Sequence, residues 1–230
     1  QGLEGAAKSD QIRCMSALVK HYQRTGDLQS LDIARKILKF VMKPAMWDDT
    51  GDSGFPGHEH GVWSGHFHNG TQALMGLLTI AEATDDDKLR QIVREGYNHA
   101  LQNGIARIGW FPAWSYPARF NRPANLLEVT EPCALADTAC LAVLMTDAGL
   151  GDYWDDVESV VRNTLLAQQV TDLEKFRLVS GVEKDTEGHE NLKRFNGGFV
   201  NGTLTHLWND MPGCCTANGG QSIYYTWHGI

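Results

Sequence analysis

The clearest indication of the fold is the segment Thr71-Gln-Ala-Leu-Met-Gly-Leu-Leu-Thr-Ile-Ala81, which is followed by a polar turn at Ala83-Thr-Asp-Asp86 and an amphipathic segment from Lys88 to Leu101. The first segment is small and apolar on most sides, whereas the last carries apolar residues on one helical face and charges on the other. This combination predicts a helical hairpin with one buried helix and one helix that has a solvent-facing side.

The same plan occurs twice more along the chain. The two further copies, each given as helix, turn and helix, are Cys14–Tyr22, Arg24–Asp27 and Ser30–Val41, then Ala136–Met145, Asp147–Asp152 and Tyr153–Gln169. Small apolar inner helices that alternate with charged outer helices, separated by long insertions, predict an all-α (α/α) barrel or toroid. An irregular helical bundle is the alternative.

Length and composition fit one folded domain. The 230 residues are 42% apolar and 21% charged, which is enough to bury a sizeable core, so we expect a single (α/α)-barrel-type domain over residues 1–230. A closed ring needs more hairpins than these, so we expect a fragment of a longer chain, with the ring completed by a missing segment or in a homo-oligomer. Gly- and Asn-rich sequence predicts a short β-hairpin near residues 180–205.

Charge and cysteine usage limit the partners and the compartment. The net charge is −8 without a cluster of Lys and Arg, which argues against nucleic acid as a partner and suits a neutral carbohydrate. No apolar run reaches the roughly 20 residues that span a bilayer, so no membrane partner is expected. Five cysteines, an odd and clustered set, favour metal binding in a reducing compartment such as a bacterial cytoplasm. Secretion stays open, because Gln1 need not be the natural first residue.

Three cysteines and one glutamate have the spacing of a metal site. Cys214 and Cys215 are adjacent, and Glu131 and Cys133 are two residues apart upstream. Adjacent cysteines do not readily bridge each other, but they can place two thiolates on one soft ion. Three sulfurs and one carboxylate therefore predict a four-coordinate Zn²⁺ site, either structural or catalytic.

The two cysteine motifs resemble those of the DUF1680 group of sugar hydrolases, which includes the family 127 β-L-arabinofuranosidases. The signature of that group is Glu-x-Cys at the head of an inner helix, followed later in the chain by Cys-Cys-Pro-Pro-Asn. Here the motifs read Glu131-Pro-Cys133 and Cys214-Cys-Thr-Ala-Asn218, with both prolines replaced. The resemblance covers residues 63–230 and includes Gly151-Asp-Tyr-Trp154 in the third hairpin.

The resemblance implies a retaining glycoside hydrolase that acts on an arabinofuranoside-like substrate. The Zn²⁺ ligands that it implies are Glu131, Cys133, Cys214 and Cys215. It also implies that Cys214 is the nucleophile, and a covalent thioglycosyl intermediate would give retention of configuration. The family's general acid/base glutamate falls at Ser115 in this chain, so Glu128 is the nearest candidate for that role.

Histidines and aromatic residues in the insertions predict a carbohydrate cleft. A neutral imidazole donates at one nitrogen and accepts at the other, and aromatic faces pack on the C–H faces of sugars. The candidate substrate-binding residues are His58, His60, His66, His68, Trp63 and Trp114. A second metal at these histidines is disfavoured, because a His-x-His pair in a loop lacks a third fixed ligand.

Two other functions stay open at this point. A sugar epimerase or uronic-acid lyase on the same barrel would use His66 and His68 as acid and base and would need no zinc. A non-catalytic carbohydrate-binding or scaffold domain would hold a structural zinc. Zinc content and a Cys214→Ser variant distinguish these alternatives from the hydrolase.

Overall fold

The computed structural model describes residues 3–42, 65–115, 130–179, 181–200 and 213–230. The first hairpin consists of α1 (Leu3–Thr25) and α2 (Leu28–Val41), which pack against each other. Between them the chain turns at Gly26, whose φ of +74° favours glycine. The Asp27 side chain then accepts hydrogen bonds from the first free amides of α2, and this cap fixes where the second helix begins.

The second hairpin consists of α3 (Phe67–Thr84) and α4 (Asp87–Leu101). Asp85 closes α3 in the left-handed conformation, and the Asp86 side chain caps α4 by accepting from two backbone amides. Helix α3 is buried along most of its length. The buried residues of α4 fall on one face, as expected of an outer helix: Leu89, Val93, Gly96, Tyr97 and Ala100.

The third hairpin departs from the prediction in its second half. Helix α5 (Pro132–Asp147) is regular, but the predicted helix from Tyr153 to Gln169 consists of α6 (Trp154–Val160), a π-helical turn (Val161–Leu165) and a 3-10 turn (Leu166–Gln168). The Thr164 hydroxyl lies 2.9 Å from the Val160 carbonyl and 2.6 Å from the Gly109 carbonyl. A hydroxyl that competes for a helical carbonyl and reaches a neighbouring segment favours such a local change of helical pitch.

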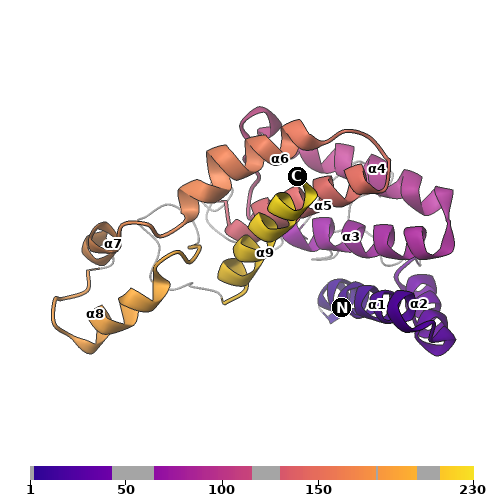
Figure 1. The fold of residues 1–230 in the computed structure, drawn as a ribbon, viewed down its shortest axis with the longest axis horizontal. Coiled ribbons are helices and arrows are strands. Elements are labelled where there is room, and N and C mark those ends of the chain that lie inside the picture. Colours follow the sequence, from indigo (N-terminus) through magenta and orange to yellow (C-terminus); the bar gives the residue numbers. More distant parts are fainter. Residues whose placement is uncertain (1–2, 43–64, 116–129, 180, 201–212) are drawn as a thin grey trace.

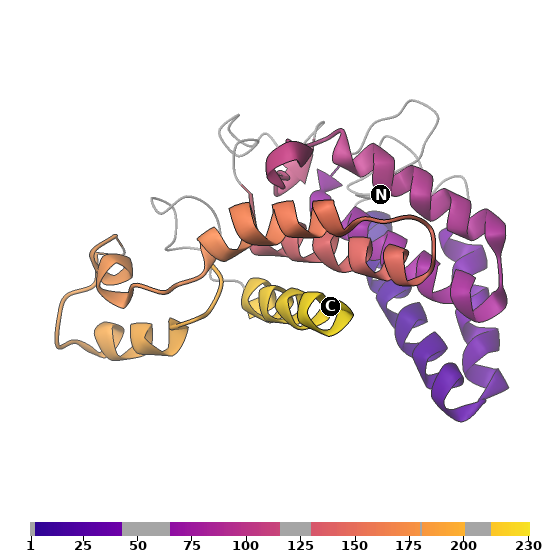
Figure 2. The ribbon, with the colours of Figure 1, turned by 45° about the horizontal axis from the view of Figure 1, so that its top comes forward.

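The helices follow one another around an arc (Figures 1 and 2). Helix α3 packs against α1 on one side and α5 on the other, and α5 packs in turn against α9 (Gly213–Gly229). The outer helices α2, α4 and α6 each pack on the inner helix of their own hairpin. One continuous core runs through the hairpins. This arrangement is that of an (α/α) toroid, and the predicted all-α fold class is confirmed.

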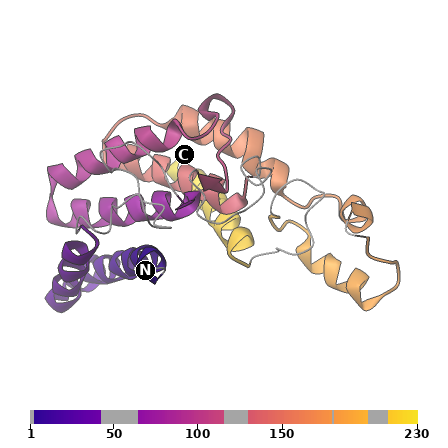
Figure 3. The ribbon, with the colours of Figure 1, turned by 180° about the vertical axis from the view of Figure 1, so that it is seen from behind.

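A smaller unit projects from the end of the arc opposite α1 and α2 (Figure 3). It contains α7 (Leu173–Val179), α8 (Glu187–Leu192) and a 3-10 turn (Lys193–Phe195). These elements share a separate small core formed by Val170, Phe176, Leu192 and Val200.

The β-hairpin predicted near residues 180–205 is wrong for the residues that the structure describes there. Thr186 caps α8 by accepting from the His189 amide, so the middle of this stretch is helical. Gly197, with a φ of +79°, then turns the chain so that Phe199 forms an isolated bridge with Gln169 rather than with a neighbour in sequence. Residues 201–205 lie outside the described part.

Two short strands lie beside the start of α3. Strand β1 (Gly65–His66) pairs antiparallel with β2 (Trp114–Ser115), so that His66 is opposite Trp114. A 3-10 turn (Ala106–Ile108) connects the end of α4 toward β2. Among the described residues, no helix combines the length and apolar character needed to cross a bilayer.

Candidate active site

Three sulfur atoms meet where α5 and α9 begin. Cys133 lies in the first turn of α5, directly after Pro132, and Cys214 and Cys215 lie in the first turn of α9. Because the two helices pack together, the three sulfurs lie within 4.8 Å of one another, and the Sγ atoms of Cys133 and Cys215 are 3.3 Å apart. That separation is longer than a disulfide bond, and all five cysteines are free.

Burial differs among the three cysteines. Cys133 and Cys215 are inaccessible to solvent, whereas Cys214 is exposed. The contact with Cys215 and burial raise the pKa of the Cys133 thiol, and burial together with Cys133 raises the pKa of Cys214. Three thiols this close, two of them buried, form a soft donor set of the kind that binds Zn²⁺. The residues present therefore fit the metal that the resemblance implies.

The β1–β2 pair positions two histidines at the start of α3. His66 is the N-cap of α3 and His68 lies in its first turn. Between them, Phe67 points into the core, stacks on Phe111 with ring centroids 5.3 Å apart, and donates its amide to the Ala113 carbonyl at 3.0 Å. This anchor fixes the backbone that carries the two imidazoles, whose rings are perpendicular with their centroids 4.2 Å apart.

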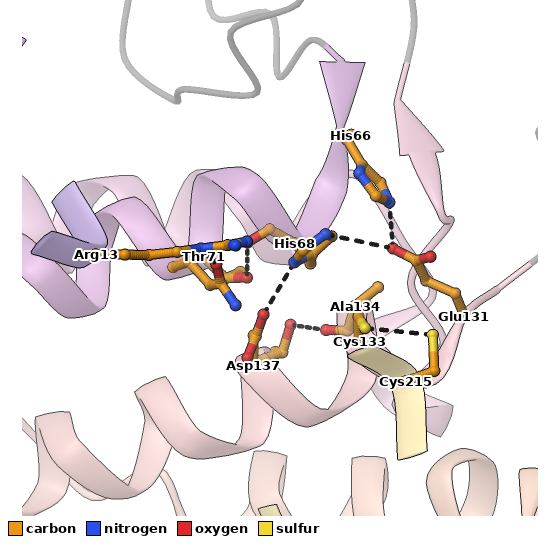
Figure 4. Close-up of polar contacts among 11 residues, drawn as sticks. Arg13, His66, His68, Thr71, Glu131, Cys133, Ala134, Asp137 and Cys215 are labelled. Atoms are coloured by element: carbon orange, nitrogen blue, oxygen red, sulfur yellow. Dashed lines mark hydrogen bonds and ion pairs between the residues drawn. The ribbon is translucent and has the colours of Figure 1, made fainter. Parts of the chain in front are cut away.

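Glu131, the N-cap of α5, lies between these histidines and the sulfur cluster. Its Oε1 is hydrogen-bonded to His66 Nε2 and lies 4.0 Å from His68 Nε2 (Figure 4). The same carboxylate also contributes to the raised pKa values of Cys133 and Cys214, so its charge is felt at the sulfurs. Only 6% of Glu131 is exposed, so the negative charge is held in a largely dry place.

His68 has a second carboxylate partner on its other side. Its Nδ1 lies 3.1 Å from Asp137 Oδ2, and both residues are 5% exposed. Burial raises the pKa of Asp137, whereas the hydrogen bond with His68 acts in the opposite direction. A polar chain therefore runs from Asp137 through His68 and Glu131 to His66 (Figure 4).

The predicted site residues divide into three groups. The structure brings six of them into two neighbouring clusters, one of Cys133, Cys214 and Cys215 and one of His66, His68 and Glu131, so that Glu131 groups with the histidines rather than with the three sulfurs. The backbone of Trp114, in β2, lies opposite His66. The remaining candidates lie outside the described residues: His58, His60, Trp63 and Glu128.

The sequence analysis did not identify Asp137. Its signal is an acidic residue inside the otherwise apolar run of α5, one turn after Cys133 and therefore on the same face of the helix. Buried carboxylates are rare without a partner, so this position could have been singled out.

Comparison with protein-family models identifies the family of the chain. The model of the β-L-arabinofuranosidase catalytic domain of glycoside hydrolase family 127 matches residues 5–226, which is most of the chain. Comparison with curated proteins and with solved structures finds no match.

Proposed function

The chain belongs to the catalytic-domain family of the family 127 β-L-arabinofuranosidases, and on this basis we propose that it is a retaining glycoside hydrolase with Cys214 as the nucleophile. The proposed substrate is an arabinofuranoside-like glycoside. The observation that carries the proposal is the convergence of three sulfurs within 4.8 Å at the starts of two inner helices. The family match favours hydrolysis over the epimerase or lyase alternative.

We assign the Zn²⁺ of this proposal to the sulfur cluster. Cys133, Cys214 and Cys215 would hold it, and Glu131, which acts electrostatically on Cys133 and Cys214, is the proposed carboxylate ligand. When bound, Zn²⁺ keeps its cysteine ligands as thiolates at neutral pH, which makes a sulfur nucleophilic.

Accessibility selects Cys214 among the three sulfurs. A sugar carbon must reach the attacking atom, and Cys133 and Cys215 are buried, whereas Cys214 is exposed. In the first step the Cys214 sulfur forms a bond to the anomeric carbon while the bond from that carbon to the leaving oxygen breaks, and the leaving oxygen takes a proton from a general acid. In the second step a water molecule gives its proton to the same group and displaces the sulfur, so that configuration is retained.

We propose Glu128 as the general acid and base. The family's glutamate falls at Ser115 by its spacing from Glu131 in the sequence, and a serine hydroxyl does not titrate near neutral pH. Glu128 lies only three residues before Glu131 in sequence, although outside the described residues.

We assign the binding of sugar hydroxyls to His66 and His68, because both imidazoles face the carboxylate next to the sulfur cluster. The side chain of His66 is 23% exposed and that of His68 is 7% exposed, so His66 is the more accessible of the two. His58, His60, Trp63 and Trp114 stay predictions for the same cleft.

A test starts from the zinc-loaded protein and aryl arabinofuranosides. The wild-type chain should release the aryl alcohol with retention, read from the anomer formed first in an NMR time course. Cys214→Ser should lower kcat on the order of 10⁴-fold or more, as loss of a nucleophile does in other enzymes. A slow substrate should add its glycosyl mass to the peptide that contains Cys214.

Cys14→Ser is the matched control, because Cys14 is also an exposed cysteine but lies on α1 outside the sulfur cluster. It should leave turnover unchanged. Wild-type turnover in Cys214→Ser would remove the nucleophile from the proposal. Stoichiometric zinc without turnover on any aryl glycoside would favour the structural-zinc scaffold instead.

A further inference from the structure

We propose that three residues behind the candidate active site, Arg13, Gln72 and Asp137, act as a positioning triad. Together they hold the His68 imidazole in one tautomer, with the proton on Nδ1 and the lone pair on Nε2. His68 then accepts a hydrogen bond from a sugar hydroxyl, so the substrate must offer a hydroxyl proton at that position. The sugar as ligand rests on the proposed function, whereas the tautomer of His68 is tested without a glycoside.

Arg13 sets the direction of the hydrogen bonds at the outer end of the triad. Its Nε is hydrogen-bonded to the Gln72 side-chain oxygen, although the two residues are 59 positions apart, on α1 and α3. A guanidinium has donors and no acceptor, so the Gln72 oxygen accepts and the Gln72 NH2 group is left to donate. The acceptor for that group is the Asp137 carboxyl on α5, toward which Arg13 also extends (Figure 4).

Asp137 accepts from both of its neighbours. Its Oδ2 lies 3.1 Å from His68 Nδ1, and Gln72 donates to the same carboxyl group. Burial raises the pKa of Asp137, whereas its two hydrogen bonds and the charge of Arg13 act in the opposite direction and favour the carboxylate. An imidazole is ordinarily a stronger base than a carboxylate, so the proton between Asp137 and His68 belongs to Nδ1.

The second nitrogen of His68 is left for a ligand. A neutral imidazole has one N–H and one lone pair, so a proton on Nδ1 makes Nε2 an acceptor. Nε2 lies 4.0 Å from Glu131 Oε1, which is beyond hydrogen-bonding distance, and a carboxylate has no proton to donate. A sugar hydroxyl that enters beside Glu131 supplies the donor that Nε2 lacks.

Burial makes the tautomer difficult to reverse. His68 and Asp137 are each 5% exposed, so water does not readily replace either partner of their hydrogen bond. The Thr71 hydroxyl also donates to the His68 carbonyl at 3.0 Å, which holds the backbone that carries the ring. A fixed, largely dry acceptor discriminates strongly, because a ligand without the matching donor leaves it unpaired.

The first test is NMR of the zinc-loaded protein with isotope-labelled histidine. The shifts of the ring nitrogens distinguish a protonated from an unprotonated nitrogen, and the His68 signals are assigned through the backbone. Wild type should show a protonated Nδ1 and an unprotonated Nε2 at His68. A protonated Nε2 would overturn the proposal, and this measurement requires no variant to fold.

Variants of the triad give a second readout in the same spectra. In Asp137→Asn the one remaining oxygen is needed by Gln72, so the new NH2 group faces Nδ1 and the proton should move to Nε2. Arg13→Met should populate both tautomers, whereas Arg13→Lys keeps a donor and a positive charge and should keep the wild-type tautomer. Asp147→Asn is the matched control, because it makes the same change at the exposed end of α5. The wild-type tautomer in folded Asp137→Asn would overturn the role of the triad.

The kinetic test uses aryl arabinofuranosides in which one hydroxyl at a time is replaced by fluorine, which accepts weakly and cannot donate. The ratio of kcat/KM for the hydroxyl and fluoro substrates is compared between wild type and Asp137→Asn, so that the electronic effect of fluorine cancels. At one sugar position this ratio should fall on the order of 10-fold in the variant, because Nε2 no longer needs a donor.

The pattern across sugar positions separates positioning from a structural role. Equal ratios in wild type and Asp137→Asn at every position would overturn the assignment of an accepting His68 to a sugar hydroxyl. Absence of turnover on every arabinofuranoside would instead remove the proposed hydrolysis. The NMR result would then still decide whether the triad fixes the tautomer.

Discussion

Gly109 lies between α4 and β2 and packs against the backbone of α6. Replacing it tests how much this contact contributes to the free energy of unfolding. Its φ is +69°, in the left-handed region, and an added Cβ would overlap backbone atoms of Ser159 and Val160. Its carbonyl accepts a hydrogen bond from the Thr164 hydroxyl at 2.6 Å. Gly109→Ala should therefore destabilise the protein by two separate effects.

The two effects have different magnitudes and can be separated. The left-handed conformation costs a residue with a Cβ about 1–2 kcal/mol. Overlap with packed atoms that cannot move away adds about 1–3 kcal/mol. Gly149→Ala is the matched control, because Gly149 has a φ of +72° but no atom within 4 Å of an added Cβ, so only the first effect applies.

The assay is urea unfolding followed by far-ultraviolet circular dichroism, with the free energy of unfolding obtained for wild type and both variants. Gly109→Ala should lose about 1–3 kcal/mol more than Gly149→Ala. Equal losses would show that Gly109 is not tightly enclosed and would refute this account of the α6 contact. If Gly109→Ala does not fold, Thr164→Val gives a milder probe, with an expected loss of about 0.5–1.5 kcal/mol.

Two further predictions concern titratable groups away from the histidines. In the metal-free protein, iodoacetamide should modify the exposed Cys14 and Cys214 before Cys140. The reason is that burial raises the pKa of Cys140 to about 12, whereas the thiolate is the form that reacts. Peptide mapping that finds Cys140 modified first would contradict this prediction. Burial also raises the pKa of Asp156, which accepts a hydrogen bond from Tyr97 at 2.9 Å. Between the unfolded pKa of 3.8 and the higher folded pKa, the folded state therefore binds more protons than the unfolded state. The stability contributed by this carboxyl consequently falls as pH rises through that range. Asp156→Asn should therefore raise the free energy of unfolding near neutral pH, with a gain that shrinks on acidification toward about pH 4; a gain that does not change with pH in urea titrations would be inconsistent with a buried charge.

The hairpins were predictable from sequence because their signals are local. Asp27 and Asp86 cap the helices that follow them, and each cap is formed with amides two or three residues away. The apolar spacing of α3 and α5 then distinguishes buried from half-buried helices. Such signals need no knowledge of distant contacts, so the turns and the outer helices of the first two hairpins agree closely with the structure, whereas α1 begins at Leu3, well before the predicted start at Cys14.

The elements that sequence did not predict depend on residues far apart in the chain. The helix after Trp154 changes pitch where Thr164 reaches Gly109, 55 residues away. Phe199 pairs with Gln169 rather than with a close neighbour, which defeats a hairpin prediction made from local Gly and Asn residues. Strands of two residues, such as β1, are also too short to show an alternating pattern.

The candidate site shows the same division. The spacing of Glu131, Cys133 and the Cys-Cys pair was enough to predict that sulfur would gather at a single place, because adjacent ligands in sequence are strong metal signals. The partnership of His68 with Asp137 was not predictable in this way, since the two residues are 69 positions apart and on different helices. The contact between His68 and Asp137 exists only because α3 and α5 pack side by side.

The convergence of the site follows from the hairpin architecture itself. Each inner helix is followed by an outer helix that returns the chain to the same end of the ring, so successive inner helices begin near one another. His66 is the N-cap of α3, Glu131 is the N-cap of α5, and the Cys-Cys pair opens α9. Residues at the starts of these helices therefore meet, although more than half of the chain separates the first from the last.

The positive ends of the helix dipoles point to the same place and favour carboxylate and thiolate there. The arrangement of the hairpins thus supplies both the proximity of these residues and part of the electrostatic field that favours an anionic ligand set.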